Sequence, residues 1–418
     1  MTIRETIRKD GLRIITCNIP TQTKVLVSIS AGVGSAWDPA DRQGFFHYFE
    51  HIAFKGTARR NARQINEFRD RHLLASNAGT GRMQTEYWGT AVYTKLDLLS
   101  EFICDIYANS TFPAVEIAKE KGPVLLEAAR NKDNDGYRGD LALRELLYKK
   151  NPLRQFSTGT EEGIRSITRR DLLREKARWY VPANTVAIAV GRVSHQAFVR
   201  NIESHIPFDA TPVLLREWDP EFALLPPISR EIIERKDRSK TTVMMACKMP
   251  DRVNDRVEAA EDFVISLLAS GHSSRLWEEI RSRRGLAYAA DGSMARYPGL
   301  GAYFNTFVQT APGREALVEK LTRQALFAPI TQKDRKLFEM TRERANDIIT
   351  AGFGENLGVW ADAIQDKLAK GESVLGLRHY FAEQRRIVNS LTLREAEKIR
   401  RELFRPERFV TVIVRPAK

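Results

Sequence analysis

The stretch GFFHYFEHIAFKGT, residues 44–57, decides the local fold of the first part of the chain. It is almost entirely apolar and aromatic, so the element it forms is expected to be buried. The sequence DPAD before it, residues 38–41, supplies helix start signals, and the Gly-Thr pair at its end supplies a stop signal. The stretch therefore predicts a buried helix over residues 44–55.

Three polar side chains interrupt this apolar stretch, namely His47, Glu50 and His51. Residues three and four apart share one face of a helix, and a buried carboxylate beside two imidazoles is costly unless something pairs with it. A divalent metal held by the two histidines offsets that cost and leaves the glutamate free for chemistry. The alternative is a chance grouping of core or surface residues. The spacing HxxEH, the inverse of the HExxH zinc-protease helix, favours the metal.

A catalytic zinc site needs a third protein ligand and an open position. Glu120 and Glu127 lie seven residues apart, so on a helix they project from nearly the same face. Taken alone, this segment is equally typical of an amphipathic helix with ordinary surface acids. The other five histidines have no paired spacing.

Composition and charge exclude several classes of protein. The chain has 418 residues, an ordinary globular balance of apolar and charged residues, and no apolar run long enough to span a membrane. Its three cysteines lie far apart without a CxxC motif, which indicates a reducing cytoplasm. The net charge of +13 comes from arginines scattered among acids, so we expect a solvated basic surface and no nucleic-acid site.

The chain consists of two similar halves, each of which begins and ends with an apolar strand and has helical segments between. A proline-rich segment without sustained periodicity separates them and is typical of a linker. We predict a metal-binding peptidase domain over 1–208, a linker over 209–229 and a substrate-binding domain over 230–418, related by a diverged duplication. The strands that define the pattern are expected at KVLVSISAG (24–32), NTVAIAVGR (184–192), TTVMMACKMP (241–250) and ERFVTVIVRP (407–416).

The motif HYFEHIAFKGT, followed 76 residues after His51 by Glu127, resembles the pitrilysin family of inverzincin metallopeptidases, in its half-length bacterial form. That family includes mitochondrial processing peptidase and insulin-degrading enzyme. The resemblance implies one zinc ion per chain, held by His47, His51 and Glu127, with Glu50 as the general base. It also implies that Glu120 supports the site from behind the ligands.

Further motifs extend the resemblance along essentially the whole chain. NAGTGRMQTEYWGT (77–90) is similar to the family's substrate-binding strand, which implies that Asn77, Ala78 and Thr80 contact an extended peptide. SSRLWEEIRSRRGLAY is similar to the family's signature in the second domain, which implies that Arg281 and Tyr288 bind the substrate backbone and that the tyrosine stabilises the oxyanion.

The chain departs from the family's pattern at two places. Leu73 and Leu74 stand where the family has glycines before the substrate-binding strand. Gly122 and Pro123 fall between the two glutamates, where the family has an unbroken helix. A proline inside a helix removes a hydrogen bond and kinks the axis, so the position of Glu120 stays open.

The resemblance also implies a fold and a function. The fold is α+β, with two similar domains, each a mainly antiparallel sheet covered by helices, arranged as a half-clamshell. The function is that of a zinc metalloendopeptidase that cleaves unstructured peptides or leader peptides in a chamber formed by dimerisation. A homodimer and a heterodimer with a homologous subunit both fit, and the alternative function is a non-catalytic or partner-dependent subunit of such a heterodimer. The sequence names neither the substrate nor the cleaved bond.

Overall fold

The computed structural model describes residues 1–213, 229–250, 254–352 and 356–417. The chain divides into two compact units, each with its own sheet and apolar core. Unit 1 is made of Met1–Arg130, Phe156–Arg216 and Glu355–His379, and unit 2 is made of Asn131–Gln155, Glu217–Gly354 and Tyr380–Lys418.

The units differ from the predicted domains because each takes in a segment from the other half of the chain. Residues 131–155 belong to unit 2 and residues 355–379 to unit 1, whereas the predicted boundaries follow chain order. Most of the predicted linker, residues 214–228, lies outside the described residues.

In the described part of unit 1, six strands form one mixed sheet in the order β1-β2-β6-β3-β5-β4. Only β2 and β6 are parallel neighbours among these described strands; the other pairs are antiparallel. The strands are β1 Thr2–Ile7, β2 Arg13–Asn18, β3 Lys24–Ala31, β4 Ala75–Thr80, β5 Thr85–Val92 and β6 Thr185–Gly191.

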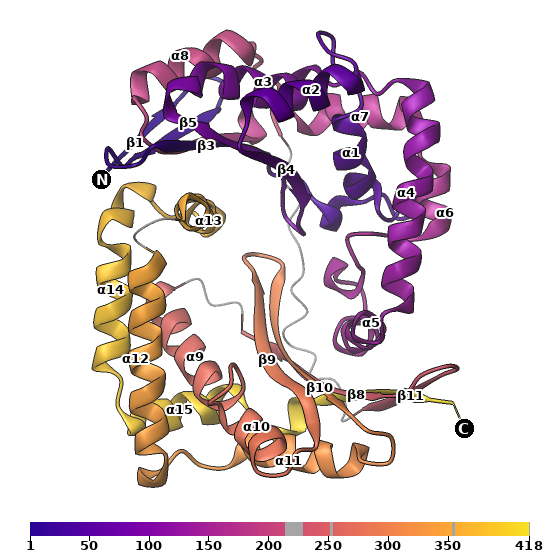
Figure 1. Ribbon diagram of the computed structural model, residues 1–418, viewed down its shortest axis with the longest axis vertical. Helices are drawn as coiled ribbons and strands as arrows, with labels where there is room; N and C mark the ends of the chain where they lie inside the picture. Colours follow the sequence, from indigo (N-terminus) through magenta and orange to yellow (C-terminus); the bar gives the residue numbers. More distant parts are fainter. Residues whose placement is uncertain (214–228, 251–253, 353–355, 418) are drawn as a thin grey trace. The chain divides into compact units, whose positions relative to one another are not determined.

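Helices cover both faces of this sheet. Those from the first half of the chain are η1 Ser35–Trp37, α1 Phe45–Ala53, α2 Ala62–His72, η2 Tyr93–Lys95, α3 Leu96–Asn109, α4 Ala114–Asp133, α6 Glu161–Ser166, α7 Arg169–Trp179, η4 Pro182–Asn184 and α8 His195–His205. From the second half come α13 Leu357–Ala369 and η7 Val374–Gly376. Figure 1 shows α3 and α8 over one face of the sheet and α13 against the other.

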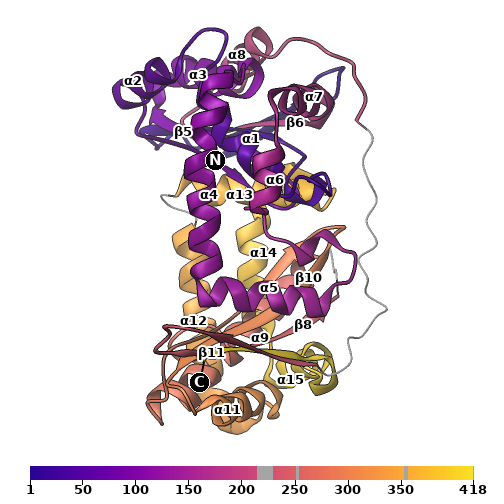
Figure 2. The same ribbon diagram turned by 90° about the vertical axis from the view of Figure 1, so that its right-hand side faces the viewer.

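In the described part of unit 2, five strands form a sheet in the order β7-β11-β8-β10-β9. They are β7 Arg230–Arg235, β8 Thr241–Met249, β9 Ala287–Tyr297, β10 Gly301–Thr310 and β11 Val410–Pro416. The helices are α5 Asp135–Leu147, η3 Pro152–Arg154, α9 Asp255–Leu268, α10 Arg275–Trp277, the π-helical η5 Glu278–Ser282, α11 Glu315–Phe327, η6 Gln332–Asp334, α12 Arg335–Gly352, α14 Leu377–Ser390, α15 Leu393–Leu403 and η8 Pro406–Arg408. Figure 2 shows α5 along one face of this sheet and α11 on the opposite side.

The two sheets repeat one topology, as the duplicated pattern in the sequence predicted. In each, one parallel pair (β2-β6 or β11-β7) is followed by three antiparallel neighbours, and the outermost strand is β4 in unit 1 and β9 in unit 2. The four predicted strands are confirmed as β3, β6, β8 and β11. The fold class, two helix-covered and mainly antiparallel sheets, is therefore confirmed.

The helix predicted over residues 44–55 is confirmed as α1, and its aromatic side chains lie in the core of unit 1. Phe49 stacks on Tyr180 at a ring distance of 4.6 Å and meets Phe112 edge-on at 4.9 Å. Gly44 precedes the helix with a φ of 89°, and a Cβ there would lie 2.8 Å from the Thr158 carbonyl oxygen. Only glycine satisfies both constraints at this position.

Among the described residues, no helix has both the length and the apolar character needed to cross a membrane.

Candidate metal and catalytic site

Two turns of α1 and one residue of α4 bring together, in unit 1, three side chains that could hold a metal ion. The rings of His47 and His51 lie edge to face with centroids 4.7 Å apart. Their Nε2 atoms each lie 3.5 Å from one oxygen of the Glu127 carboxylate. One ligand atom from each residue lies within 4.8 Å of the other two, and in the described part of the chain no other group of three or more His, Cys, Asp or Glu residues is arranged in this way.

The first turn of α1 is held by a carboxylate from the preceding loop. Asp38 accepts the backbone N–H of Gly44 at 2.7 Å and that of Phe46 at 3.0 Å, which are donors left free at a helix N-terminus. Burial raises the pKa of Asp38 to about 7, although both hydrogen bonds oppose the shift. The sequence indicated Asp38 only as part of a helix start. Its hydrogen bond to Phe46 joins residues eight apart across a loop, and the sequence does not predict the path of that loop.

The electrostatics of the two histidines differ. Burial, followed by the nearby His51, lowers the pKa of His47 to about 4, so its imidazole is neutral at pH 7 and able to bind a metal. Burial also acts to lower the pKa of His51, but the hydrogen bond to Glu120 and the carboxylates of Glu50 and Glu127 outweigh it and leave that pKa raised.

Glu120 lies beside the site despite the proline that follows it. Helix α4 runs unbroken through Pro123, and Glu120 is 8% exposed, with Oε1 at 3.1 Å from His51 Nδ1. A hydrogen bond there fixes the imidazole so that Nε2 points to the ligand position. Tyr48 also ties the two helices together by donating to the Ile117 carbonyl at 2.6 Å. The sequence left the position of Glu120 open, and in the structure Glu120 lies next to His51, where the resemblance implied.

Lys55 is a site residue that the sequence analysis missed. Its ammonium lies 2.7 Å from Glu120 Oε2. Burial acts to raise the pKa of Glu120, but the bonds from His51 and Lys55 outweigh it, and the pKa is lowered. The available signal was the spacing, since Lys55 follows His51 by four residues and continues the same face beyond the end of α1.

Glu50, the predicted general base, faces the hairpin of β4 and β5. Its Oε2 accepts the hydroxyl of Thr80 at 2.8 Å, and the same hydroxyl lies 3.2 Å from the Phe46 carbonyl oxygen. Burial raises the pKa of Glu50, while the bond from Thr80 acts in the opposite direction. The sequence assigned Thr80 to substrate binding, whereas its side chain contacts the carboxylate of Glu50.

The predicted substrate-binding strand is β4, the outermost strand of the unit 1 sheet. No described strand pairs with its outer edge. Asn77 is exposed on it and Ala78 is half-buried, and both line the pocket that contains the metal-binding residues. An extended peptide can add to such an edge through main-chain hydrogen bonds.

The predicted arginine–tyrosine pair lies in unit 2. Arg281 belongs to η5 and donates to the Ala287 carbonyl at 3.0 Å, and its guanidinium carbon lies 5.5 Å from the ring centre of Tyr288. Tyr288 lies on β9 and is 76% exposed. Gly285, with a φ of 60°, follows the helical turns and precedes β9.

The residues present fit a zinc ion. Two imidazole nitrogens and one carboxylate are a donor set typical of catalytic zinc, and it leaves a fourth position for water or substrate. The bond between Glu120 and His51 Nδ1 leaves Nε2 of His51 as the available donor atom. The Nδ1 atom of His47 is buried and has no hydrogen-bond partner in the described part of the chain, so no hydrogen bond at this atom orients the ring.

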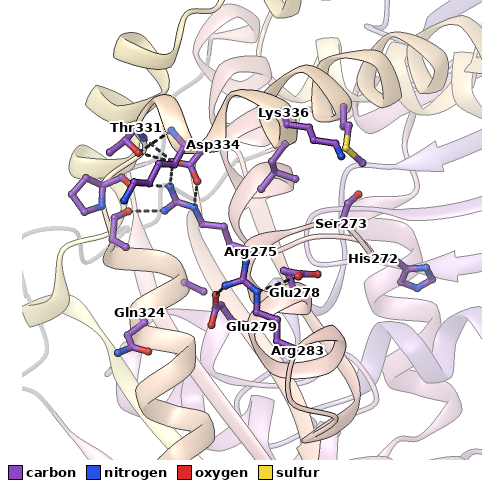
Figure 3. A pocket seen from close by; sticks show the side chains of 16 residues that line it. His272, Ser273, Arg275, Glu278, Glu279, Arg283, Gln324, Thr331, Asp334 and Lys336 are labelled. Atoms are coloured by element: carbon purple, nitrogen blue, oxygen red, sulfur yellow. Dashed lines mark hydrogen bonds and ion pairs between the residues drawn. The ribbon is translucent and has the colours of Figure 1, made fainter.

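A larger pocket, of about 830 Å³, lies in unit 2 (Figure 3) and does not share this chemistry. Its two arginines are paired with acidic side chains. Arg275 pairs with Asp334 and donates to two carbonyls, and Arg283 pairs with Glu278 and Glu279. The candidate site is therefore the smaller pocket in unit 1.

Comparisons with known proteins show which family the chain belongs to. The family described as Insulinase (Peptidase family M16) matches residues 13–160, and the one described as Peptidase M16 inactive domain matches residues 166–333. An uncharacterized zinc protease of Rickettsia bellii is 30% identical over 374 residues, which cover 88% of this chain and 87% of the relative. One of Streptomyces coelicolor is 28% identical over 336 residues, covering 78% of this chain and 71% of the relative.

Two solved structures share the fold. A protease from Helicobacter pylori has a TM-score of 0.87 at 19% identity, with 99% of each chain covered. A peptidase M16 inactive domain from Pseudomonas fluorescens has a TM-score of 0.85 at 20% identity, with 100% of this chain and 99% of that chain covered. The resemblance drawn from the motifs is confirmed: this chain belongs to peptidase family M16.

Proposed function

We propose that this chain is a zinc metalloendopeptidase that hydrolyses unstructured peptides. The observation that carries the proposal is the convergence of His47, His51 and Glu127 with the carboxylate of Glu50 beside them. The zinc-protease relatives support it, since their names state the same activity class.

The residues of the chain divide the chemistry among them. Bound zinc would polarise the scissile carbonyl and acidify a water molecule. Glu50 accepts a proton from the attacking water and returns it to the leaving amine, because among the described residues it is the site carboxylate that forms no ion pair with a histidine or lysine. Thr80 holds one oxygen of Glu50 in place, and Glu120 orients His51.

The substrate is proposed to lie as an added strand along β4, with Asn77 and Ala78 beneath the residues that flank the scissile bond. Arg281 and Tyr288 are proposed to bind the peptide backbone, with the tyrosine as a hydrogen-bond donor to the oxyanion. The exposure of Tyr288 supports this role, and its hydroxyl has no hydrogen-bond partner among the described residues. We further propose assembly into a dimer, as a homodimer or with a homologous subunit, that processes precursor or leader peptides.

The test combines metal content with cleavage of a quenched library of unstructured peptides. We expect one zinc per purified chain, loss of cleavage with a chelator, and recovery when zinc is added. Glu50→Gln should lower kcat by about 100-fold or more, because it removes the general base while the three metal ligands remain. Its zinc content should equal that of the wild type.

The outcomes separate the alternatives. Zinc without cleavage would indicate a partner-dependent subunit, and cleavage should then return when the co-purifying homologue is added. A chain that binds no zinc would contradict the proposal. Unchanged cleavage by the Glu50→Gln variant would show that Glu50 is not the general base.

A further inference from the structure

The candidate metal site lies in a pocket of about 360 Å³ within unit 1. Besides the metal-binding residues and Glu50, its lining includes two cations, Lys55 and Arg69. The proposed reaction makes no use of Arg69. Its effect on a substrate depends on whether its charge is already neutralised by the protein.

The two cations differ in this respect. Lys55 forms an ion pair with Glu120 at 2.7 Å. Arg69 has no carboxylate partner in the part of the chain that the structure describes. Its Nε donates to the Ser76 hydroxyl and its Nη2 to the Ser76 carbonyl oxygen, both at 2.8 Å, and its guanidinium lies 5.4 Å from the ring centre of Phe54.

These contacts fix the guanidinium but leave one edge of it open. Both bonds to Ser76 use the side of the group formed by Nε and Nη2. The end-on edge, formed by Nη1 and the second hydrogen of Nη2, matches a carboxylate in a two-bond arrangement. Because Ser76 precedes Asn77 on β4, Arg69 is held beside the strand along which the substrate is proposed to lie.

The charge of the pocket also favours an anion. A divalent ion, Lys55 and Arg69 together carry one more positive charge than the three carboxylates Glu50, Glu120 and Glu127 neutralise. The histidines add no charge when they bind the metal as neutral imidazoles. Without Arg69 the pocket would be neutral.

We propose that Arg69 is a specificity-determining residue that binds a carboxylate of the substrate, carried by an Asp or Glu side chain next to the scissile bond. The inference rests on the proposed function, because it requires a peptide in this site. A free C-terminal carboxylate has the same chemistry, so the test must separate the two sources.

The test uses the full-length, zinc-loaded chain and quenched peptides with both ends capped. The peptides differ only in one residue flanking the scissile bond, which is Glu, Gln or Lys. We expect kcat/KM for the Glu peptide to exceed that for the Gln peptide by about 10- to 100-fold, as for a charge-assisted two-bond contact. In Arg69→Gln the preference should fall to within about 2-fold, with cleavage of the Gln peptide retained, and Arg69→Glu should favour the Lys peptide.

Two variants control for charge and for folding. Arg63 lies on the same helix, α2, with its side chain 87% exposed, and pairs with Glu67 on the surface. Arg63→Gln removes the same charge and should keep the full preference. Arg69→Lys keeps the positive charge but lacks the planar two-bond donor of a guanidinium, so it should keep part of the preference for the Glu peptide. Retained zinc and retained cleavage of the Gln peptide show that β4 is intact in each variant.

Several results would overturn the inference: equal cleavage of the Glu and Gln peptides by the wild type, an unchanged preference in Arg69→Gln, or an equal loss in Arg63→Gln. A preference confined to peptides with an uncapped C-terminus would assign Arg69 to the terminal carboxylate and also overturn it. If the wild type cleaves no peptide, the proposed function fails separately. The inference is then decided by the binding of labelled, capped Glu and Gln peptides to two proteins, the Glu50→Gln variant and the double variant Glu50→Gln, Arg69→Gln. Tighter binding of the Glu peptide to the first protein only would support the inference, and equal binding of both peptides to the first would overturn it.

Discussion

Around the metal site, each acidic side chain has a different partner and therefore a different task. Glu127 faces the two imidazoles, Glu120 bonds to His51 and Lys55, and Glu50 accepts a hydrogen bond from the Thr80 hydroxyl. The properties of a carboxylate depend on its neighbours, and on this basis the three glutamates are proposed to serve as ligand, support and base. A substitution of a residue that contacts one glutamate tests that glutamate's role while leaving the carboxylate in place.

Thr80→Val removes the hydroxyl that holds Glu50 and keeps the shape of the side chain. We expect kcat to fall by about 10-fold, the value of one hydrogen bond to a charged group, with KM and zinc content unchanged. Thr80→Ser, which retains the hydroxyl, should keep most of the activity. Steady-state kinetics on one capped peptide decide the matter. A raised KM with unchanged kcat would instead support the substrate-binding role that the sequence predicted.

Asp38 makes the stability of unit 1 depend on pH. The folded-state pKa of about 7 lies above the ordinary 3.8, so its contribution is fully present below pH 3.8 and is lost as pH rises through 7. Each pKa unit corresponds to about 1.4 kcal/mol, and since Asp38 is only partly buried by area, screening should reduce the total to about 1–3 kcal/mol.

The measurement is urea unfolding of the wild type and Asp38→Asn between pH 4.5 and 8. The stability of the wild type relative to the variant should fall as pH rises across this range. A constant difference would mean that Asp38 does not titrate there, and a rising difference would mean that its pKa is lowered by folding.

At the scale of the element, α4 carries two glutamates to the site although Gly122 and Pro123 lie between them. The helix persists because one missing hydrogen bond costs less than the packing of its buried side chains, Ile117, Val124 and Ala128, contributes. Local propensity is weak here, and tertiary contacts decide the conformation.

Gly122→Ala should therefore stabilise the chain. Beyond its two chain neighbours, a Cβ at Gly122 meets nothing within 4 Å, and alanine favours a helix interior over glycine by about 0.5–1 kcal/mol. Pro123 offsets part of this gain, because a proline disfavours helical backbone at a preceding residue that carries a Cβ. The matched control is Gly163→Ala in α6, where a Cβ would lie 2.4 Å from the Gln43 carbonyl oxygen, so that variant should be destabilised by about 1–3 kcal/mol. Thermal unfolding of both variants would show this, and stabilisation of both, or of neither, would contradict it.

At the scale of the whole molecule, the two halves of the chain exchange segments between the units. Helix α13, from the second half, packs on β3 and β6 of unit 1 with Leu357, Trp360 and Ile364 buried. Helix α5, from the first half, packs on β8 and β11 of unit 2 with Leu143 and Leu147 buried. Neither unit is therefore encoded by a continuous piece of the chain.

Separate expression of residues 1–213 and 229–418 should yield poorly folded proteins. Each large apolar side chain that loses its burial costs about 1.5–3 kcal/mol, so the loss of one exchanged helix approaches the stability of a typical domain. Co-expression of the two pieces should restore a soluble, zinc-binding complex. The readouts are solubility, circular dichroism and zinc content. A stable, zinc-binding 1–213 fragment would contradict the expectation.

The sequence by itself determined the α1 helix, the histidine and glutamate spacing on it, the repeated strand pattern and the family. The helix and the spacing follow from local periodicity, in which residues three, four or seven apart share a face whatever surrounds them, and the family follows from the resemblance of the motifs. The tertiary structure alone showed that Glu120 reaches His51, that Thr80 bonds to Glu50, that Arg69 lacks a carboxylate partner among the described residues, and that α5 and α13 change units. Each of these joins residues from different elements, and such contacts depend on how apolar faces pack, which no spacing along the chain encodes.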